Sequence, residues 1–579
     1  MGLAEPSEPP AYVSFGPYQM TAKELTVEIE KGRGESKTTE AVRVSAPFEV
    51  LGECRDPRGN AWGKVLRWRD ADGRQHEHHV ADSETHGEPA VLCASLADQG
   101  LRIDRDRQRH FARYLSKVCV KRRLTVVART GWHDIGGRSI FVLPGETIGP
   151  RGAERVILDA DASGLYEARG NVDEWREGVA TLARGHLLLM VAISTALAGP
   201  LAYFAGHEGG GVHFFGQSSI GKTTALRLGA SVWGRGDTPG FVRTWRATAN
   251  GLEGAAAGAT DTVLILDELG QAEARDLATT LYMLANGGGK ARACRDGSLR
   301  EPRTWRVLTL SSGESPVDAK LTEDRGRKTR AGQLVRMMDI PADRGLGFGV
   351  FDNGGPDNDP SAFVKRCKIA AASAYGTAGP EFIRRLIAVG AISDDVRALV
   401  NDFIAANVPN GADGQIIRGA QRLGLIAAAG ELATKVDLTG WRNGEAWAGA
   451  AWALKQWIED RGGLEPAEIR QAIAQVRRFF EAHGEARFDR SDSLDDARPV
   501  SNRAGWRKGQ GEDRRWFVPP ETWKLEVCAG LDLKLVAREL AKRGIMEKAL
   551  DGYQPVWKIQ GKSQRGYVIT PRIFDGGGE

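Results

Sequence analysis

Cysteine is scarce in this chain, and the few cysteines present are not paired along the sequence. Six are spread over 579 residues, and no two of them form a C-x-x-C pair. This spacing excludes a zinc ribbon and offers no disulfide framework, so we expect a protein of the reducing cytoplasm. The cysteines are Cys54, Cys93, Cys119, Cys294, Cys367 and Cys528.

The sequence also lacks a signal peptide pattern and a long uninterrupted apolar run. Met1 is followed by an acidic, proline-rich segment instead of a basic region and an apolar core, so we expect no signal peptide. The longest apolar run, 187–203, is interrupted by two hydroxyl residues, a glycine and Pro200. It falls short of a membrane span, and it predicts a buried helix in a protein without a membrane partner.

An excess of charge of one sign is absent as well. The chain has 79 Lys and Arg against 75 Asp and Glu, a net charge of +4. A general polycation is thereby excluded, and any contact with DNA has to come from local basic patches. The hydrophobic content of 41% is that of an ordinary globular protein. A chain of this length is too long for one core and predicts about three or four domains.

A complete phosphate-binding motif stands out from this ordinary composition. The apolar run 212–215 predicts a buried strand, a G-x-x-x-x-G-K-T loop follows, and 224–233 can continue as a helix. Backbone N–H groups and the helix dipole favour an anion at such a turn, which argues against a chance glycine-rich loop. We expect ATP, with Lys222 on its β- and γ-phosphates and Thr223 on Mg²⁺. The predicted nucleotide contacts are Gly216, Gln217, Ser218, Ser219, Ile220, Gly221, Lys222, Thr223 and Thr224.

Two carboxylates follow the next clear buried strand. The strand is predicted over 262–266 and ends in Asp267 and Glu268. In a parallel sheet this carboxyl end lies at the same edge as the phosphate loop. Asp267 is therefore predicted to hold Mg²⁺ through its water shell, and Glu268 to polarise the attacking water. The interval after Lys222 leaves room for one helix, one strand and a further helix.

A third strand, predicted over 305–310, ends in Ser311 and Ser312. A small polar side chain here is suited to sit between the carboxylates and the γ-phosphate. An ordinary transition from a strand to a loop can have the same sequence. The two serines are therefore either the sensor or part of such a transition.

A cationic hairpin is predicted between the carboxylates and this third strand. Asp296-Gly297 is a signal for a tight turn, and its two arms carry cations without acidic residues. Such a hairpin suits a phosphate backbone, here that of single-stranded or forked DNA, and the alternative is a solvated surface hairpin. The predicted DNA contacts are Lys290, Arg292, Arg295 and Arg300.

Several arginines follow the third strand. Hydrolysis requires a cation on the developing charge of the γ-phosphoryl group, often supplied by a neighbouring subunit. Arg336 is our first choice, because the apolar run 337–341 predicts a strand that would hold it rigidly. Arg330 is the second choice and Arg325 a further alternative.

The order of these motifs resembles one known family. GQSSIGKT, WRATANGLEG, LILDELG, NGGGKARACRDG and LTLSSGE, with ARTGWHD upstream and SNRAGWRKG downstream, look like the family called "domain of unknown function 927". The resemblance covers most of the chain from about 45 to 570. Members are typical of mobile elements and prophages, and some resemble replicative helicases of the MCM and superfamily 3 type.

This resemblance implies a fold and further residue roles. The implied fold class is α/β: an AAA+ P-loop core, with a parallel sheet flanked by helices, that forms a hexameric ring on DNA. Arg336 matches the arginine-finger segment, and Arg418 resembles the second sensor of the lid, with Arg422 as its rival. The segment 505–546 resembles a winged helix. No primase motif is apparent, so a separate primase or polymerase would be a partner.

The leading hypothesis is an ATP-driven DNA helicase or translocase that replicates a mobile element or phage. The alternative is a regulatory AAA+ switch, in defence or transposition, that assembles on partner proteins without unwinding DNA. The predicted organisation is a flexible lead-in (1–40), a β-rich N-terminal domain (41–170), the ATPase core (171–345, with preceding helices at 172–205), a helical lid-like region (346–490) and a winged-helix-like C-terminal domain (491–579).

Overall fold

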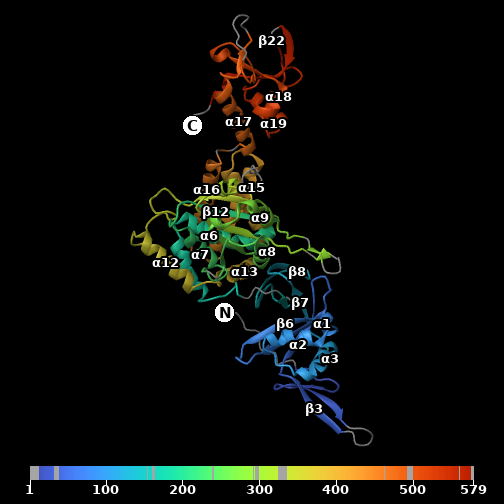
Figure 1. Ribbon diagram of the computed structural model, residues 1–579. Helices are drawn as coiled ribbons and strands as arrows, with labels where there is room; N and C mark the ends of the chain where they lie inside the picture. The colour runs from blue at the N-terminus through green and yellow to red at the C-terminus, as the bar shows by residue number, and fades with distance from the viewer. Residues whose placement is uncertain are drawn as a thin grey trace. The chain divides into compact units, whose positions relative to one another are not determined.

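Two compact units make up the chain in the computed structural model (Figure 1). One unit comprises Met1–Val408 with Arg418–Trp457, and the other Pro409–Ile417 with Ile458–Glu579. The five-part division expected from the sequence remains a prediction. The structure describes residues 12–31, 38–152, 154–159, 164–237, 240–290, 292–293, 299–300, 302–323, 335–390, 392–461, 463, 465–491, 500–559 and 561–575.

The first unit begins with three sheets of short strands. An antiparallel sheet has the order β1-β2-β3, a mixed sheet the order β11-β7-β4-β5-β6, and a small antiparallel sheet the order β10-β9-β8. A tight turn at Asp72-Gly73 joins β5 to β6. The strands are β1 (Tyr18–Met20), β2 (Leu25–Lys31), β3 (Thr38–Ser45), β4 (Glu49–Arg55), β5 (Gly63–Arg69), β6 (Gln75–Ala81), β7 (Arg123–Val127), β8 (Gly131–Ile135), β9 (Arg138–Leu143), β10 (Glu146–Ile148) and β11 (Val156–Leu158).

Three short helices lie between β6 and β7 in the chain and pack against the first two of these sheets. They are α1 (Asp82–Thr85), α2 (Pro89–Asp98) and α3 (Gln108–Lys117). Phe111 and Tyr114 on α3 pack against Phe48 in a buried cluster that includes residues of β1 and β2. Strands therefore predominate over helices in this part of the chain.

A helical segment leads into the second half of the first unit. Asn171 and Glu174 form a capping box at the start of α4 (Val172–Trp175), which continues through η3 (Arg176–Ala180) and α5 (Thr181–Ala183). The helix α6 (Leu187–Ala205) follows. It is the one helix of the described residues that is long and apolar enough to cross a membrane, but 83% of its apolar window is buried inside the fold. The predicted buried helix is confirmed.

A five-stranded sheet, parallel throughout, forms the centre of this unit. Its order is β13-β14-β17-β12-β18. Because every strand runs the same way, all carboxyl ends meet at one edge. The strands are β12 (Gly210–Phe215), β13 (Val242–Thr244), β14 (Val263–Asp267), β17 (Leu308–Gly313) and β18 (Met337–Pro341).

Helices pack on the two faces of this sheet. Leu264 and Leu266 of β14 belong to a core shared with α8 and α9. Gly229 of α7 lies against α6 and against Leu310 of β17, so α6 and α7 cover the sheet there. Between Lys222 and Asp267 the chain forms one helix, one strand and one helix, as predicted. The helices are α7 (Lys222–Ala230), α8 (Ala249–Gly258), η4 (Leu269–Gln271), α9 (Ala274–Asn286) and α10 (Val317–Thr322).

A buried ionic cluster joins the N-terminal strands to the parallel sheet. Asp261, fully buried just before β14, accepts hydrogen bonds from the Trp132 backbone N–H at 2.8 Å and from Arg306 Nε at 2.7 Å. Arg129 lies 3.6 Å from the same carboxylate. Gly131 has φ +89, and a Cβ there would collide with Asp261. The sequence ARTGWHD therefore makes the joint between the two parts of this unit.

A helical region follows the sheet. It contains α12 (Pro360–Ser373), α13 (Ala378–Val389), α14 (Ile392–Asn407), α15 (Gly414–Lys435) and α16 (Glu445–Asp460). The long helices α15 and α16 each begin in one unit and end in the other.

The second unit mixes helices with a four-stranded sheet of order β19-β20-β21-β24. Phe480, Trp516 and Trp523 lie in its core. Its elements are α17 (Ala467–His483), β19 (Phe488–Arg490), β20 (Gly505–Lys508), β21 (Arg515–Val518), α18 (Pro520–Thr522), η6 (Trp523–Val527), α19 (Leu533–Lys542), β22 (Val556–Ile559), β23 (Lys562–Arg565), β24 (Tyr567–Ile569) and η7 (Pro571–Phe574).

Candidate nucleotide-binding site

The predicted phosphate loop connects β12 to α7. Lys222 begins the helix, and its ammonium donates to the carbonyl oxygens of Gly216 at 2.8 Å and Gln217 at 2.5 Å. Burial lowers the pKa of Lys222, while the charges of Glu314 and Asp267 act in the opposite direction. The ammonium therefore lies inside the curve of the loop, where a phosphate would meet it together with the N–H groups of the helix start.

Backbone geometry at Gly221 depends on the absence of a side chain. This residue has φ +101, and a Cβ would approach Val350 and Phe351. The segment after β18 lies against the loop, since the Ala342 N–H donates to Phe215 at 2.7 Å and the Val350 N–H to Ile220 at 3.0 Å.

Asp267 accepts hydrogen bonds from two side chains and one backbone N–H group. The hydroxyl of Thr223 donates to its Oδ2 at 2.9 Å, and the hydroxyl of Ser312 donates to its Oδ1. The backbone N–H of Glu268 also donates to Oδ1, at 3.0 Å. Three elements distant in sequence, β12–α7, β14 and β17, thus place their polar side chains together at the carboxyl edge of the sheet.

The oxygen atoms of Thr223 and Asp267 fit the preference of Mg²⁺ for hard oxygen ligands. No group of three or more His, Cys, Asp or Glu side chains suited to a metal occurs in the described part of the chain. The remaining ligands of a bound Mg²⁺ would therefore be phosphate oxygens and water, which is the usual situation at nucleotide sites.

Glu268 adopts a backbone conformation that is uncommon for its residue type. Its φ is +60 and its ψ is +65, and its side chain is exposed. The side-chain amide of Gln271 donates to its carboxylate. Sequence reasoning missed Gln271, because a polar residue in a short loop gives no signal without the fold.

The two serines of the predicted sensor face different neighbours. Ser312 contacts Asp267, whereas Ser311 is buried on the other side of β17. The Ser311 hydroxyl accepts from the Trp245 indole at 2.8 Å and lies 2.9 Å from Nδ1 of His213, whose Nε2 lies 3.1 Å from the Ser315 carbonyl. Burial lowers the pKa of His213 to about 4, so the ring is neutral and Nε2 carries its proton. The geometry favours Ser312 over Ser311 as the sensor.

Arg336 lies at the opposite edge of the sheet from the phosphate loop. It directly precedes β18, and its carbonyl accepts from the Gly211 N–H at 2.9 Å, at the amino end of β12. Its guanidinium lies 4.0 Å from the centre of the Tyr282 ring and donates to Asn286. Arg336 is thus on the wrong edge to serve the loop of its own chain.

Arg422, the alternative to Arg418 as second sensor, binds backbone carbonyl groups of two strand ends. It is buried on α15, and it donates to the carbonyls of Val335 at 2.5 Å and Gly209 at 3.3 Å, at the amino ends of β18 and β12. Burial lowers its pKa to about 10. Arg418 is exposed on the same helix. Its sensor role remains a prediction.

The predicted cationic hairpin is present in the structure. β15 (Arg292–Ala293) pairs antiparallel with β16 (Leu299–Arg300), and Gly289 donates to Arg303 in the stem. In Figure 1 the hairpin projects from the body of the unit as a yellow-green ribbon. Lys290 is exposed at its base. Arg295, Arg325 and Arg330 lie outside the described residues.

Comparison with protein families identifies the N-terminal half of the chain. Residues 18–304 match the family model described as "Domain of unknown function (DUF927)". This segment belongs to the DUF927 family. The resemblance inferred from the motifs is confirmed, and the DUF927 match includes the phosphate loop, Asp267 and Glu268. The strand with Ser311 and Ser312 lies downstream of it.

Solved structures extend the likeness beyond the DUF927 segment. A structure titled "SCCmec type IV Cch - active helicase" is 18% identical, with a TM-score of 0.72, over 96% of this chain and 98% of that chain. At this identity the likeness shows a shared fold. A "putative ATPase" from Cytophaga hutchinsonii ATCC 33406 is 11% identical over 49% of this chain and 85% of that one, and its TM-score of 0.28 carries no argument. No curated protein matches the sequence.

Proposed function

We propose that this protein is an ATP-dependent DNA helicase or translocase with an AAA+ core that works as a hexameric ring on a mobile element or phage. The observation that carries the proposal is the convergence of Lys222, Thr223, Asp267, Ser312 and Glu268 at one edge of a parallel sheet. A chance loop would not be accompanied by a metal-binding pair and a neighbouring carboxylate.

Each of these side chains has a distinct task in the proposed reaction. Lys222 and the loop N–H groups bind the β- and γ-phosphates, and Thr223 with Asp267 holds Mg²⁺, which neutralises the developing charge. Glu268 accepts a proton from the attacking water. Ser312 orients Asp267 through its hydrogen bond.

The position of Arg336 supports an active site completed by a second subunit. It lies at the amino edge of the sheet, whereas the phosphate loop lies at the carboxyl edge. A cation at this place serves a neighbouring subunit's γ-phosphate and not its own. This arrangement favours a ring over an isolated monomer.

The hairpin supports DNA as the polymer on which the motor acts. Its arms carry Arg292 and Arg300 in register, with Lys290 at the base. We further infer that the C-terminal unit is a winged-helix-like DNA-binding module, whose β20–β21 hairpin carries Arg507 and Lys508 on β20 and Arg514 directly before β21. The solved structure with the shared fold is titled an active helicase, which agrees with this proposal.

Two variants of the site test the proposal directly. Lys222→Ala should abolish ATP binding and unwinding, and Glu268→Gln should abolish hydrolysis and unwinding but retain ATP binding. Lys368→Ala and Glu273→Gln, which change exposed residues outside the loop, serve as matched controls. Near wild-type hydrolysis by Glu268→Gln would refute the assignment.

A second experiment separates a motor from a regulatory switch. Reversing the charges at Lys290 and Arg292 should remove the stimulation of ATPase activity by single-stranded DNA. If the doubly reversed variant retains full DNA stimulation, the hairpin is not the DNA contact and the translocase proposal fails.

A further inference from the structure

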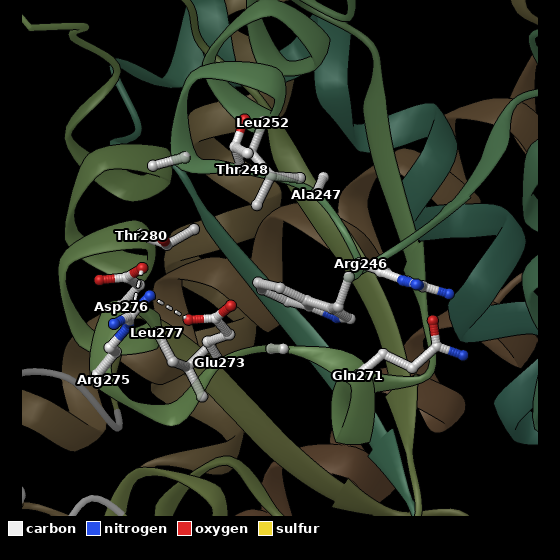
Figure 2. Close-up of a pocket in the computed structure, with 13 residues that line it drawn as sticks. Arg246, Ala247, Thr248, Leu252, Gln271, Glu273, Arg275, Asp276, Leu277 and Thr280 are labelled. Carbon is white, nitrogen blue, oxygen red and sulfur yellow. Dashed lines mark ion pairs between the residues drawn. The ribbon is translucent and has the colours of Figure 1, made fainter.

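The segment 105–123 in the N-terminal part of the chain is strongly basic. It has eight Lys and Arg against one acidic residue, although the whole chain has a net charge of only +4. By contrast, the open cleft between the first turns of α8 and α9 carries both signs, and Figure 2 shows Arg275 paired with Glu273 there. An excess of one sign in a short segment attracts a polyanion, so 105–123 is the stronger candidate for such a partner.

Helix α3 presents three of these cations along one side. Arg109, Arg113 and Lys117 follow one another at intervals of four residues, all three are exposed, and the helix contains no acidic residue. Within the described part of the chain, none of the three has an ion-pair partner. Like charges four positions apart destabilise a helix, and a bound anion would remove this repulsion. The opposite side of α3 is buried, with Phe111 and Tyr114 in the core, so the basic side is the one that can meet a partner.

The basic run continues from α3 into the start of β7, where it meets an exposed tryptophan. Lys121 and Arg122 are exposed, and the Arg122 carbonyl accepts from the Glu53 N–H at 3.0 Å. The guanidinium of Arg123 lies 5.7 Å from the centre of the Trp62 ring and pairs with the Glu53 carboxylate at 2.7 Å. The Trp62 side chain is 44% exposed. An exposed aromatic ring beside cations is the combination that stacks a base and holds the phosphates of a single strand.

The loop that carries Trp62 holds the ring in one orientation. The carboxylate of Asp56 accepts hydrogen bonds from two backbone N–H groups of the loop, each at 2.8 Å, and the Trp62 indole N–H donates to the Gly59 carbonyl at 2.9 Å. Ala61 has φ +50, which is uncommon for a residue with a side chain. Strained backbone of this kind concentrates at binding sites. The exposed ring is therefore fixed before a partner arrives, so little conformational entropy is lost on binding.

We propose that Trp62 and the cations of 109–123 bind single-stranded DNA, with a base stacked on the Trp62 indole and the phosphates along the basic side of α3. The exposed ring selects a single strand, because the bases of a duplex already stack on one another and do not present their faces. The site shares no residue with the β15–β16 hairpin and requires no ATP. It therefore goes beyond the proposed function and gives the N-terminal strands and helices a binding role of their own.

Binding of a fluorescent oligo(dT) strand to the full-length protein without ATP tests the site. A background with Lys290→Glu and Arg292→Glu removes the share of binding that belongs to the hairpin. In this background Trp62→Ala should weaken binding roughly five- to 150-fold, the range for the loss of one stacked base, whereas Trp62→Phe keeps an aromatic face and should retain most of the affinity. Val389→Ala, which shortens an apolar side chain that is 60% exposed on α13, is the control and should bind like the parent.

The salt dependence of binding counts the phosphate contacts of α3. Each phosphate contact with a single strand contributes about 0.7 to the slope of log affinity against log salt concentration. A triple variant with Arg109→Gln, Arg113→Gln and Lys117→Gln should therefore reduce the slope by about 2. Lys365→Gln combined with Lys368→Gln, at exposed cations of α12, should leave the slope unchanged.

Two results would overturn the inference. One is unchanged affinity for oligo(dT) in Trp62→Ala. The other is tighter binding of a duplex of the same length, weakened by the triple variant and not by Trp62→Ala, because the surface then binds duplex phosphates. Neither result affects the proposed function, which fails instead if the wild type has no ATPase activity or if Glu268→Gln hydrolyses ATP.

Discussion

The hydroxyl of Thr223 donates a hydrogen bond of 2.9 Å to Oδ2 of Asp267, although the two residues are 44 positions apart. The pair joins the first turn of α7 to the end of β14. It therefore links the residue that follows the phosphate-loop lysine to the strand that carries the carboxylates. A cation bound at this place therefore meets the hydroxyl oxygen of Thr223 and the carboxylate oxygen of Asp267 together.

Removal of the Thr223 hydroxyl should weaken the use of Mg²⁺. For Thr223→Ala we expect at least about a tenfold rise in the Mg²⁺ concentration for half-maximal ATPase activity, the scale typical of lost metal-site partners. Thr223→Ser keeps the hydroxyl and should behave like wild type. Titration of the ATPase rate with MgCl₂ at fixed ATP measures the difference. Equal midpoints for the Ala and Ser variants would exclude the proposed role.

The two adjacent serines should respond differently to the same substitution. Ser312→Ala removes the donor to Asp267 and should lower kcat about tenfold or more with little change in melting temperature. Ser311→Ala leaves the Trp245 indole and His213 without their common partner, and should cost about 1–3 kcal/mol of unfolding free energy. Urea unfolding and steady-state kinetics on both variants check this. The opposite pattern would reassign the sensor to Ser311.

His213 should make stability depend on pH in the acidic range. Its pKa is about 4 in the fold, against 6.5 for an ordinary His, because it is buried. The unfolded chain therefore takes up the proton first, and the neutral ring's contribution is lost as the pH falls from 6.5 to about 4. His213→Gln cannot titrate there. The difference in urea midpoint between wild type and this variant should shrink as the pH is lowered, and a constant difference would contradict the prediction.

Breaking the buried cluster at Asp261 should destabilise the first unit strongly. Burial raises the pKa of Asp261, and the hydrogen bonds from Arg306 oppose that shift. Arg306→Met leaves this carboxylate without its main cation, at an expected cost of about 3–5 kcal/mol. Thermal unfolding measures the loss. If Asp261→Asn combined with Arg306→Met is as unstable as the single Arg306→Met variant, the uncompensated charge is not the cause.

Substitution of Arg336 should affect ATPase activity, whereas substitution of Arg422 should affect the stability of the fold. Arg422→Ala should lower the melting temperature, because the carbonyls of Val335 and Gly209 lose their buried donor. Arg336→Ala should leave the fold intact and abolish ATPase activity. Mixing Arg336→Ala with Lys222→Ala should restore partial activity, since some interfaces then contain both groups. No recovery in the mixture would argue against an arginine shared between subunits.

Much of the site could be predicted because its signals are local. The phosphate loop and the strand before Asp267 each depend on short-range backbone preferences, which a few neighbouring residues determine. The order of strand, loop and helix then places Asp267 at the edge where Thr223 lies.

Other parts could not be predicted, because they depend on contacts between distant segments. The choice between Ser311 and Ser312 follows from the register of β17 between β12 and β14. The burial of Arg422 requires α15 to reach the amino ends of two strands. The pairing of Gln271 with Glu268 depends on the left-handed backbone at Glu268, which a non-glycine residue rarely adopts.

The joint at Asp261 limits how the protein can be divided. Gly131 and Trp132 supply the close backbone approach and the N–H that complete the shell of this carboxylate. A chain shortened to start after residue 170 would uncover an acid built for the protein interior, beside Arg306 and the apolar side chains of α6. A chimera that exchanges the parallel sheet therefore has to exchange the N-terminal strands with it, so that both sides of the contact at Asp261 come from the same protein.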